Sequence, residues 1–384
     1  MGPVLPQMPM HLPHLCRIEP LILVNNAKHA LKSNEDALMI DAPFTIDAPL
    51  TGLQKDDWLL AVSEVADEDG FFENLGDKHY AIFVERKPTL LVTFETVNGM
   101  RALSEMSHPL GWEMVRSYGW SHLCIASEGD TWFRDPAVYD FFDKLIDDGF
   151  FDKFERVVFY GAGPGGYAAA AYSVASPGAQ VVMIQPQATL DPRVAEWDDR
   201  FVEMRRTDFT SRFGYAPDML DAAEQAFVLY DPKVSLDAMH AALFTRANVT
   251  KLRMPNMGLA LQSELLHMDQ LEALLKLAAD GQLNTFSFAK LYRARRDYRK
   301  YLKSLLGTLE AEGRTTLILH LCRYVNARMQ APRFSRKQRA IEAELKQQAA
   351  AQNATDAEDT AVAPKQDADT PDALNDSAEE SKAV

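Results

Sequence analysis

The chain has 384 residues, a formal net charge of −15 at pH 7 and an isoelectric point of about 5.1. Because neutralising a phosphate backbone needs clustered Lys and Arg, a chain this acidic does not read as a general nucleic-acid binder. Its hydrophobic content of 47% is ample for a core, and its length allows two domains or one large domain with appendages.

Three cysteines lie far apart in the chain, at Cys16, Cys124 and Cys322. Without a C-x-x-C pair we predict neither a zinc site nor a dithiol redox centre, and three free thiols suit a reducing compartment. The first 15 residues lack the basic flank and apolar core of a signal peptide, and no stretch of 18 clean apolar residues occurs. We therefore expect a cytoplasmic protein with no metal site and no membrane partner.

The N-terminal region carries weak signals. Its first 50 residues alternate short apolar pieces with Pro and Asn, so we interpret residues 1–74 as a lead-in or an added edge of a sheet. Two β-rich runs follow, Tyr80–Glu85 and Thr89–Phe94, and Arg86-Lys87-Pro88 between them predicts a hairpin or a tight turn. Leu90–Phe94 is mainly apolar, as expected for a strand buried on both faces.

Residues 75–258 alternate strands with helices. Asp135–Asp148 has helical spacing of its apolar residues, and Asp135 before Pro136 is a helix start signal. The predicted strands are His122–Ala126, Arg156–Tyr160, Gln180–Ile184, Ala226–Tyr230 and Val249–Leu252. This alternation predicts an α/β core with a mostly parallel sheet and helices on both faces.

After Gly258 the pattern becomes helical. We predict helices over Leu259–Leu277, Phe286–Leu309 and Thr315–Met329, within a basic helical appendage at residues 259–345. The many Lys and Arg of residues 290–339 form either a solvated face or a docking surface for an acidic protein partner, for nucleic acid or for the acidic tail itself. Residues 346–384 are acidic and lack aromatics, so we predict a disordered tail.

A glycine-rich turn follows the strand Arg156–Tyr160. Gly161, Gly163 and Gly166 fit the G-x-G-x-x-G fingerprint of FAD- and NAD-binding proteins. That fingerprint also requires an acid at the end of the next strand to hold the ribose, and Gln185 stands there. A dinucleotide-binding oxidoreductase is therefore one hypothesis for this turn.

The same turn fits the nucleophile elbow of α/β-hydrolases, whose frame is G-x-S-x-G between a strand and a helix. Gly161-Ala162-Gly163-Pro164-Gly165 keeps both outer glycines and has Gly163 in the nucleophile position. Asp231 follows a strand where the triad acid is expected, and Asn256 stands where the histidine should be. His240 is the nearest alternative base.

The chain resembles a group of alphaproteobacterial α/β-hydrolase-like proteins that are often labelled phosphoadenosine phosphosulfate reductase. Gly161–Ala170, Pro186–Pro192 and Trp197–Phe201 carry the resemblance, which covers roughly Leu75–Arg339. It implies an α/β-hydrolase-type fold. The reductase activity is not carried over, because a phosphate-gripping Ser-Gly-Gly loop is missing and Cys322 lies in a helix-like run.

The candidate site residues lie at predicted strand ends, where open α/β sheets bind ligands. The catalytic candidates are Asp231, His240 and Ser127. The ligand-binding candidates are Gly161, Gly163, Gly165, Gly166, Gln185, Gln187, Glu95 and Trp132. With glycine in the nucleophile position, we favour a degenerate hydrolase that binds a small molecule or a protein. The alternative is an enzyme without a covalent intermediate, acting on a phosphorylated or sulfated molecule at the Gly165–Gly166 helix start.

Overall fold

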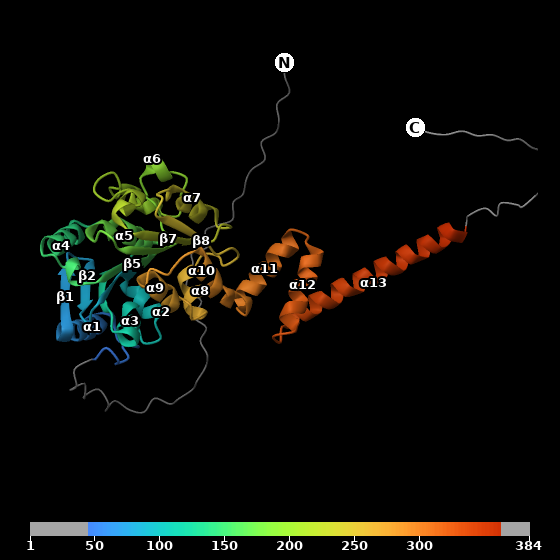
Figure 1. Cartoon of the computed structure of the whole chain (residues 1–384), viewed down its shortest axis with the longest axis horizontal. Helices are drawn as coiled ribbons and strands as arrows, with labels where there is room; N and C mark the ends of the chain where they lie inside the picture. Colours follow the sequence, from blue (N-terminus) through green and yellow to red (C-terminus); the bar gives the residue numbers. More distant parts are fainter. Residues whose placement is uncertain (1–44, 362–384) are drawn as a thin grey trace, which may run out of the picture. The chain divides into compact units, whose positions relative to one another are not determined.

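The computed structural model describes the backbone of residues 45–361 and the side chains of residues 45–354 (Figure 1). The predictions for residues 1–44, with Cys16, and for residues 362–384 lie outside the described residues. Cys124 and Cys322 are free and buried.

The core of the described chain is an eight-stranded sheet in the order β1-β2-β4-β3-β5-β6-β7-β8. Strand β2 pairs antiparallel with β1 and β4, and the other neighbours pair parallel. The strands are β1 Gly70–Leu75, β2 His79–Val84, β3 Thr89–Thr96, β4 Ser121–Ser127, β5 Arg156–Ala162, β6 Gln180–Ile184, β7 Gln225–Tyr230 and β8 Val249–Arg253.

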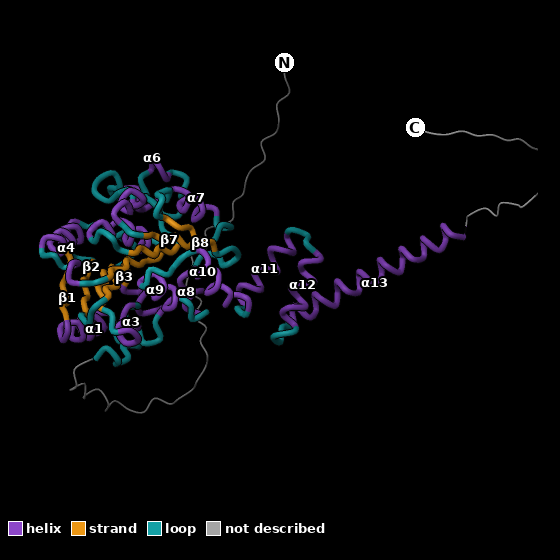
Figure 2. The backbone as a smooth tube through the Cα atoms, viewed as in Figure 1, coloured by secondary structure: helices purple, strands orange, loops and turns teal. Residues whose placement is uncertain are grey.

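Helices cover both faces of this sheet (Figure 2). One face packs against α4, α5 and α7 in a large aromatic core, and the other packs against α1, α2, α3, α8 and α9. The helices are α1 Lys55–Asp69, α2 Val97–Leu103, α3 Gly111–Tyr118, α4 Pro136–Asp147, α5 Pro164–Tyr172, α6 Pro192–Ala195, α7 Ser235–Leu243, α8 Leu261–His267, α9 Leu271–Ala279, α10 Thr285–Leu291, α11 Arg299–Ala311, α12 Thr315–Asn326 and α13 Pro332–Ala361. Short 3₁₀ turns are η1 Phe151–Lys153, η2 Ser173–Ala175, η3 Val202–Arg206, η4 Ala216–Ala222 and η5 Tyr292–Arg296.

A mostly parallel sheet with one reversed strand, crossover helices on both faces and a glycine turn after β5 is the α/β-hydrolase type. The predicted fold class is confirmed. Strands β3, β5 and β6 are buried nearly throughout, as parallel strands covered on both faces must be. The N-cap prediction at Asp135 also holds, because its side chain accepts a hydrogen bond from the Ala137 N–H.

Three details differ from the sequence predictions. The predicted helix Phe286–Leu309 is divided into α10, η5 and α11. Strands β2 and β3 do not form a hairpin, because β4 lies between them, so Arg86-Lys87-Pro88 is a tight connection across the sheet. The predicted helix Leu259–Leu277 is divided into α8 and α9 at Asp269, whose φ is 54°. Periodicity alone does not detect one left-handed residue inside an apolar repeat.

The C-terminal helices α11, α12 and α13 share a small core of their own, which includes Leu306, Cys322 and Phe334. Within the predicted tail, residues 346–361 continue α13, as the high helix propensity of Ala, Gln, Lys and Glu favours. Across the described part of the chain, none of the helices has the length and apolar character needed to traverse a bilayer.

Candidate functional site

The turn between β5 and α5 has the backbone of a nucleophile elbow. Gly163 has φ 55° and ψ −120°, and its N–H donates to the Ile184 carbonyl of β6 at 2.8 Å. In α/β-hydrolases the attacking residue sits on such a strained strand-to-helix turn at the top of the sheet. Gly163 occupies that corner without a side chain.

Gly161, Gly163 and Gly165 of the elbow differ in whether the structure leaves room for a side chain. A Cβ on Gly161 would lie 2.1 Å from the Gly165 carbonyl oxygen, and one on Gly165 would lie 2.2 Å from that of Phe94. The outer glycines therefore let α5 approach the strands closely. A Cβ on Gly163 would meet no atom within 4 Å, so that corner has room for a side chain and lacks one.

Asp231 and Asn256 follow β7 and β8, in the acid and histidine positions. Asp231 is buried, and its Oδ1 and Oδ2 accept the N–H groups of Lys233 at 2.9 Å and Gly258 at 2.8 Å. Asn256 has φ 65°, and its Oδ1 accepts a hydrogen bond from the Thr308 hydroxyl at 2.9 Å. The acid thus holds the β8 loop through backbone donors, and the residue in the histidine position offers no base.

Gln185 and Gln187 lie just past β6. The Gln185 Nε2 donates to Asp237 at 2.6 Å, and its Oε1 accepts the Leu261 N–H at 2.9 Å. Gln187 donates to the Gln185 carbonyl, while its own buried Oε1 has no partner among the described residues. Because both ends of the Gln185 amide are engaged within the protein, it does not present them to a ribose.

His240 lies on α7 in a buried polar network. Its Nδ1 accepts the Ala188 N–H at 3.2 Å and its Nε2 donates to Asp198 at 2.9 Å, so both ring nitrogens are engaged. Arg200 bonds both Asp198 and Asp237. Burial alone would raise the pKa of Asp198, but hydrogen bonds from His240 and Arg200 hold it well below its usual range. The network fastens the segment after β6 to α7.

Ser127 ends β4 and Trp132 follows in the next loop. Ser127 is fully buried and donates to the Gly129 carbonyl at 3.0 Å. Trp132 and Phe133 have φ values of 51° and 56°, which are rare for bulky residues. With Gly163, Gln185 and Asn256, left-handed backbone recurs at the carboxyl ends of four strands, and such strain clusters at functional sites.

Glu95 lies near the end of β3, half-buried, and takes part in a group of possible metal ligands with His122 and Cys124, whose ligand atoms lie within 4.8 Å of one another. The Thr93 hydroxyl donates to Glu95 at 2.6 Å and lies 2.9 Å from His122 Nε2. Burial lowers the pKa of His122 to about 3. Burial also raises the pKa of Glu95, against hydrogen bonds that lower it. The Thr93 hydroxyl thus joins two of the three possible ligands, Glu95 and His122, in a hydrogen-bonded cluster.

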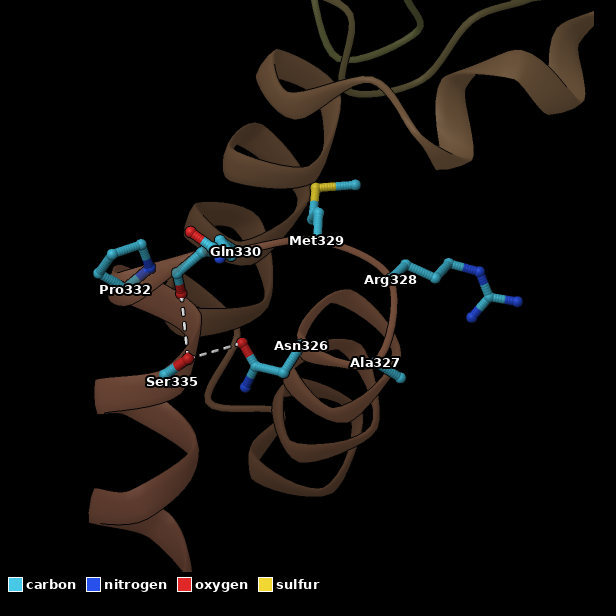
Figure 3. Close-up of a pocket in the computed structure, with 8 residues that line it drawn as sticks. Asn326, Ala327, Arg328, Met329, Gln330, Pro332 and Ser335 are labelled. Atoms are coloured by element: carbon cyan, nitrogen blue, oxygen red, sulfur yellow. Dashed lines mark hydrogen bonds between the residues drawn. The ribbon is translucent and has the colours of Figure 1, made fainter.

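Two surface hollows lie away from the elbow. One, of about 500 Å³, lies at the junction of α12 and α13 (Figure 3). There the Ser335 hydroxyl bonds Asn326 and the Ala331 carbonyl. The other, of about 460 Å³, lies between β1 and α4 and is lined partly by Phe71, Phe83 and Phe141. Neither hollow includes a sequence-predicted site residue.

Sequence reasoning missed His79 and Thr131, whose side chains lie 2.7 Å apart at the carboxyl edge of the sheet. The two residues are separated by 52 positions. Their contact depends on the pairing of β2 with β4, and no local pattern signals it.

Searches of the chain against protein-family models and against curated proteins find no match. Among solved structures, carboxyl esterase 2 from Tuber melanosporum is 14% identical, with 58% of this chain and 86% of that chain covered and a TM-score of 0.37. EstE5-PMSF is 13% identical, covers 63% and 94%, and has a TM-score of 0.38. A glycosylation-associated protein complex (Gap123) from Streptococcus agalactiae is 15% identical, with 55% of this chain covered and a TM-score of 0.36; this chain spans 46% of that chain's length. The fold assignment rests on the strand order and the elbow.

Proposed function

We propose that this protein is a degenerate α/β-hydrolase whose nucleophile elbow binds a small anionic molecule without forming a covalent intermediate. The observation that carries the proposal is Gly163, which keeps the strained backbone of a nucleophile and has open space above it. Serine hydrolase chemistry needs a hydroxyl, a base within hydrogen-bond reach and an orienting carboxylate. Here the first position is glycine and the second is Asn256.

The start of α5 supports an anionic ligand. The first N–H groups of a helix have no intrahelical partner, and the helix dipole favours negative charge beside them. Gly165 and Gly166 supply such N–H groups directly after the open corner at Gly163. A phosphate, sulfate or carboxylate group would therefore be stabilised where a hydrolase holds its reacting ester.

The test compares two substitutions of nearly equal size at Gly163. Gly163→Asp adds a carboxylate to the open corner and should repel an anion, whereas Gly163→Asn adds the same shape without the charge. Inorganic phosphate and sulfate are the probes, and thermal unfolding is the measurement. We expect both anions to raise the Tm of the wild type and of Gly163→Asn, and to leave that of Gly163→Asp unchanged.

Equal Tm shifts in all three proteins would mean that the anions bind elsewhere. No shift in any protein at millimolar anion would remove anion binding from the proposal. Isothermal titration of the wild type provides an independent check of stoichiometry, with one site per chain expected.

A further inference from the structure

A second group of polar side chains lies at the carboxyl edge of the sheet, on β2 and the loop after β4. His79 is the first residue of β2 and pairs with Ser127, the last residue of β4. Because β2 runs antiparallel, its start and the end of β4 lie at the same edge. The loop that leaves β4 carries Thr131 and leads to Asp135, the N-cap of α4.

These three side chains are arranged as nucleophile, base and orienting acid. The Thr131 Oγ1 lies 2.7 Å from His79 Nε2. His79 Nδ1 lies 3.9 Å from Asp135 Oδ2, which is within ion-pair distance but too far for a hydrogen bond, so this buried nitrogen has no hydrogen-bond partner among the described residues. The nearby carboxylate favours the tautomer with the hydrogen on Nδ1. In that tautomer Nε2 accepts the Thr131 hydroxyl hydrogen, as a general base must.

The surroundings hold this arrangement in place. His79 is 1% exposed and lies beside Phe133, and the other oxygen of Asp135 accepts the Ala137 N–H at 2.9 Å. Burial lowers the pKa of His79, against the charge of Asp135, so the ring is neutral at pH 7. Thr131 is half-buried and accepts the Phe133 N–H at 3.1 Å.

Two features beside Thr131 are unusual for a purely structural loop. Trp132 and Phe133 both have left-handed backbone, which costs on the order of 1–3 kcal/mol per residue and recurs at active sites. The indole N–H of Trp132 is buried and has no partner among the described residues.

We propose that Thr131, His79 and Asp135 form a catalytic group, separate from the elbow, that cleaves small esters. The Thr131 Oγ attacks the acyl carbon while its proton passes to His79 Nε2. The bond to the alcohol oxygen then breaks, and this oxygen takes the proton from His79 and leaves as the free alcohol. Water attacks the acyl-threonine and gives His79 a proton, and the acid departs as Thr131 regains its hydrogen. Asp135 stabilises the imidazolium in both halves.

The experiment uses the full chain and p-nitrophenyl acetate. Peptide mass mapping after a short incubation should find one acetyl group on Thr131, a result that depends on no variant. Thr131→Val keeps the shape and removes the hydroxyl, and should slow hydrolysis roughly 100-fold or more, as His79→Gln should. Thr131→Ser should retain activity. The matched control Thr210→Val removes an exposed loop hydroxyl and should change nothing.

A pH profile separates catalysis from a structural role. Because burial lowers the pKa of His79, the rate should rise with pH, and the midpoint of this rise should lie below about pH 6.5, the usual pKa of His. Acetylation at other residues only, or an unchanged rate in folded Thr131→Val, overturns the proposal.

Discussion

At the scale of single residues, the glycines of the elbow differ in whether their neighbours require a glycine at that position. Gly161 and Gly165 are required because carbonyl oxygens fill the positions their Cβ atoms would take. Gly163 is different, because it has the strain of a catalytic residue and no neighbour that demands a glycine. The motif therefore has the backbone of the elbow without the side chain that a hydrolase uses at this position.

This difference predicts unequal costs for two substitutions in one motif. Gly161→Ala should destabilise the protein by roughly 3 kcal/mol or more, because α5 must shift away from β5 to admit the methyl group. Gly163→Ala should cost only about 1–2 kcal/mol, from the left-handed backbone. Urea unfolding monitored by circular dichroism measures both values. Equal losses of unfolding free energy in the two variants would mean that α5 does not pack against β5 as closely as described.

A second prediction concerns the pH dependence of stability through Asp198. Its pKa is depressed in the folded state, so its contribution is fully present above the unfolded value of about 3.9 and is lost as the pH falls. Asp198→Asn should lower the free energy of unfolding by roughly 2–3 kcal/mol between pH 5 and 7. The gap to the wild type should narrow below pH 4.

Urea titrations at several pH values measure this gap. The neighbouring Asp199 is exposed, and its side chain forms no hydrogen bond or ion pair with any described residue, so Asp199→Asn is the matched control and should follow the wild type throughout. A constant gap for Asp198→Asn across the whole range would show that its charge does not stabilise the fold.

At the scale of elements, the sequence predicts those strands and helices that depend on a local pattern of residues. Strands β4, β5, β6, β7 and β8 follow from apolar runs bounded by turn residues, and α4 follows from its cap and its spacing. Helix α1 has apolar residues at helical spacing too, at Trp58, Val62 and Val65, within the segment interpreted as a lead-in. Strand order is different, because it depends on long-range pairing that no local pattern records.

The same limit applies to the two sites. The elbow is contiguous in sequence, so its frame and its missing hydroxyl are both predictable from Gly161–Gly165. The Thr131 group is not, since His79 reaches it only through the register of β2 on β4. The network of Asp198, Arg200 and His240 cannot be predicted from sequence alone either. Its histidine lies on α7, about 40 residues after the segment that carries Asp198 and Arg200, and only the fold brings the two together.

At the scale of the whole molecule, charge is unevenly distributed along an acidic chain. Between residues 290 and 303 there are seven basic residues and one acid, Asp297. Arg295 and Lys300 are engaged, by Tyr292 and Glu264 respectively. Five others are exposed and form no ion pair with any described residue: Lys290, Arg293, Arg296, Arg299 and Lys303. Phe288, Tyr292 and Leu302 of the same segment are buried. The exposed cations and the buried apolar side chains of this segment therefore alternate as in an amphipathic helix.

Unpaired cations on a surface favour the binding of an acidic partner, which is one of the alternatives that the sequence leaves open for residues 290–339, beside a solvated face. We expect a fluorescent poly-glutamate peptide to bind the full chain and to lose affinity as salt rises from 50 to 300 mM, because added ions screen exposed charges. Replacing Arg293, Arg296 and Arg299 with Gln should weaken binding at least tenfold at low salt. The matched control replaces Arg323, Arg333 and Lys337, which already pair with Glu342 and Glu310, and should weaken it far less. Equal losses of peptide affinity in the two triple variants, or an affinity that does not change with salt, would show that these cations form only a solvent-exposed surface and no docking site.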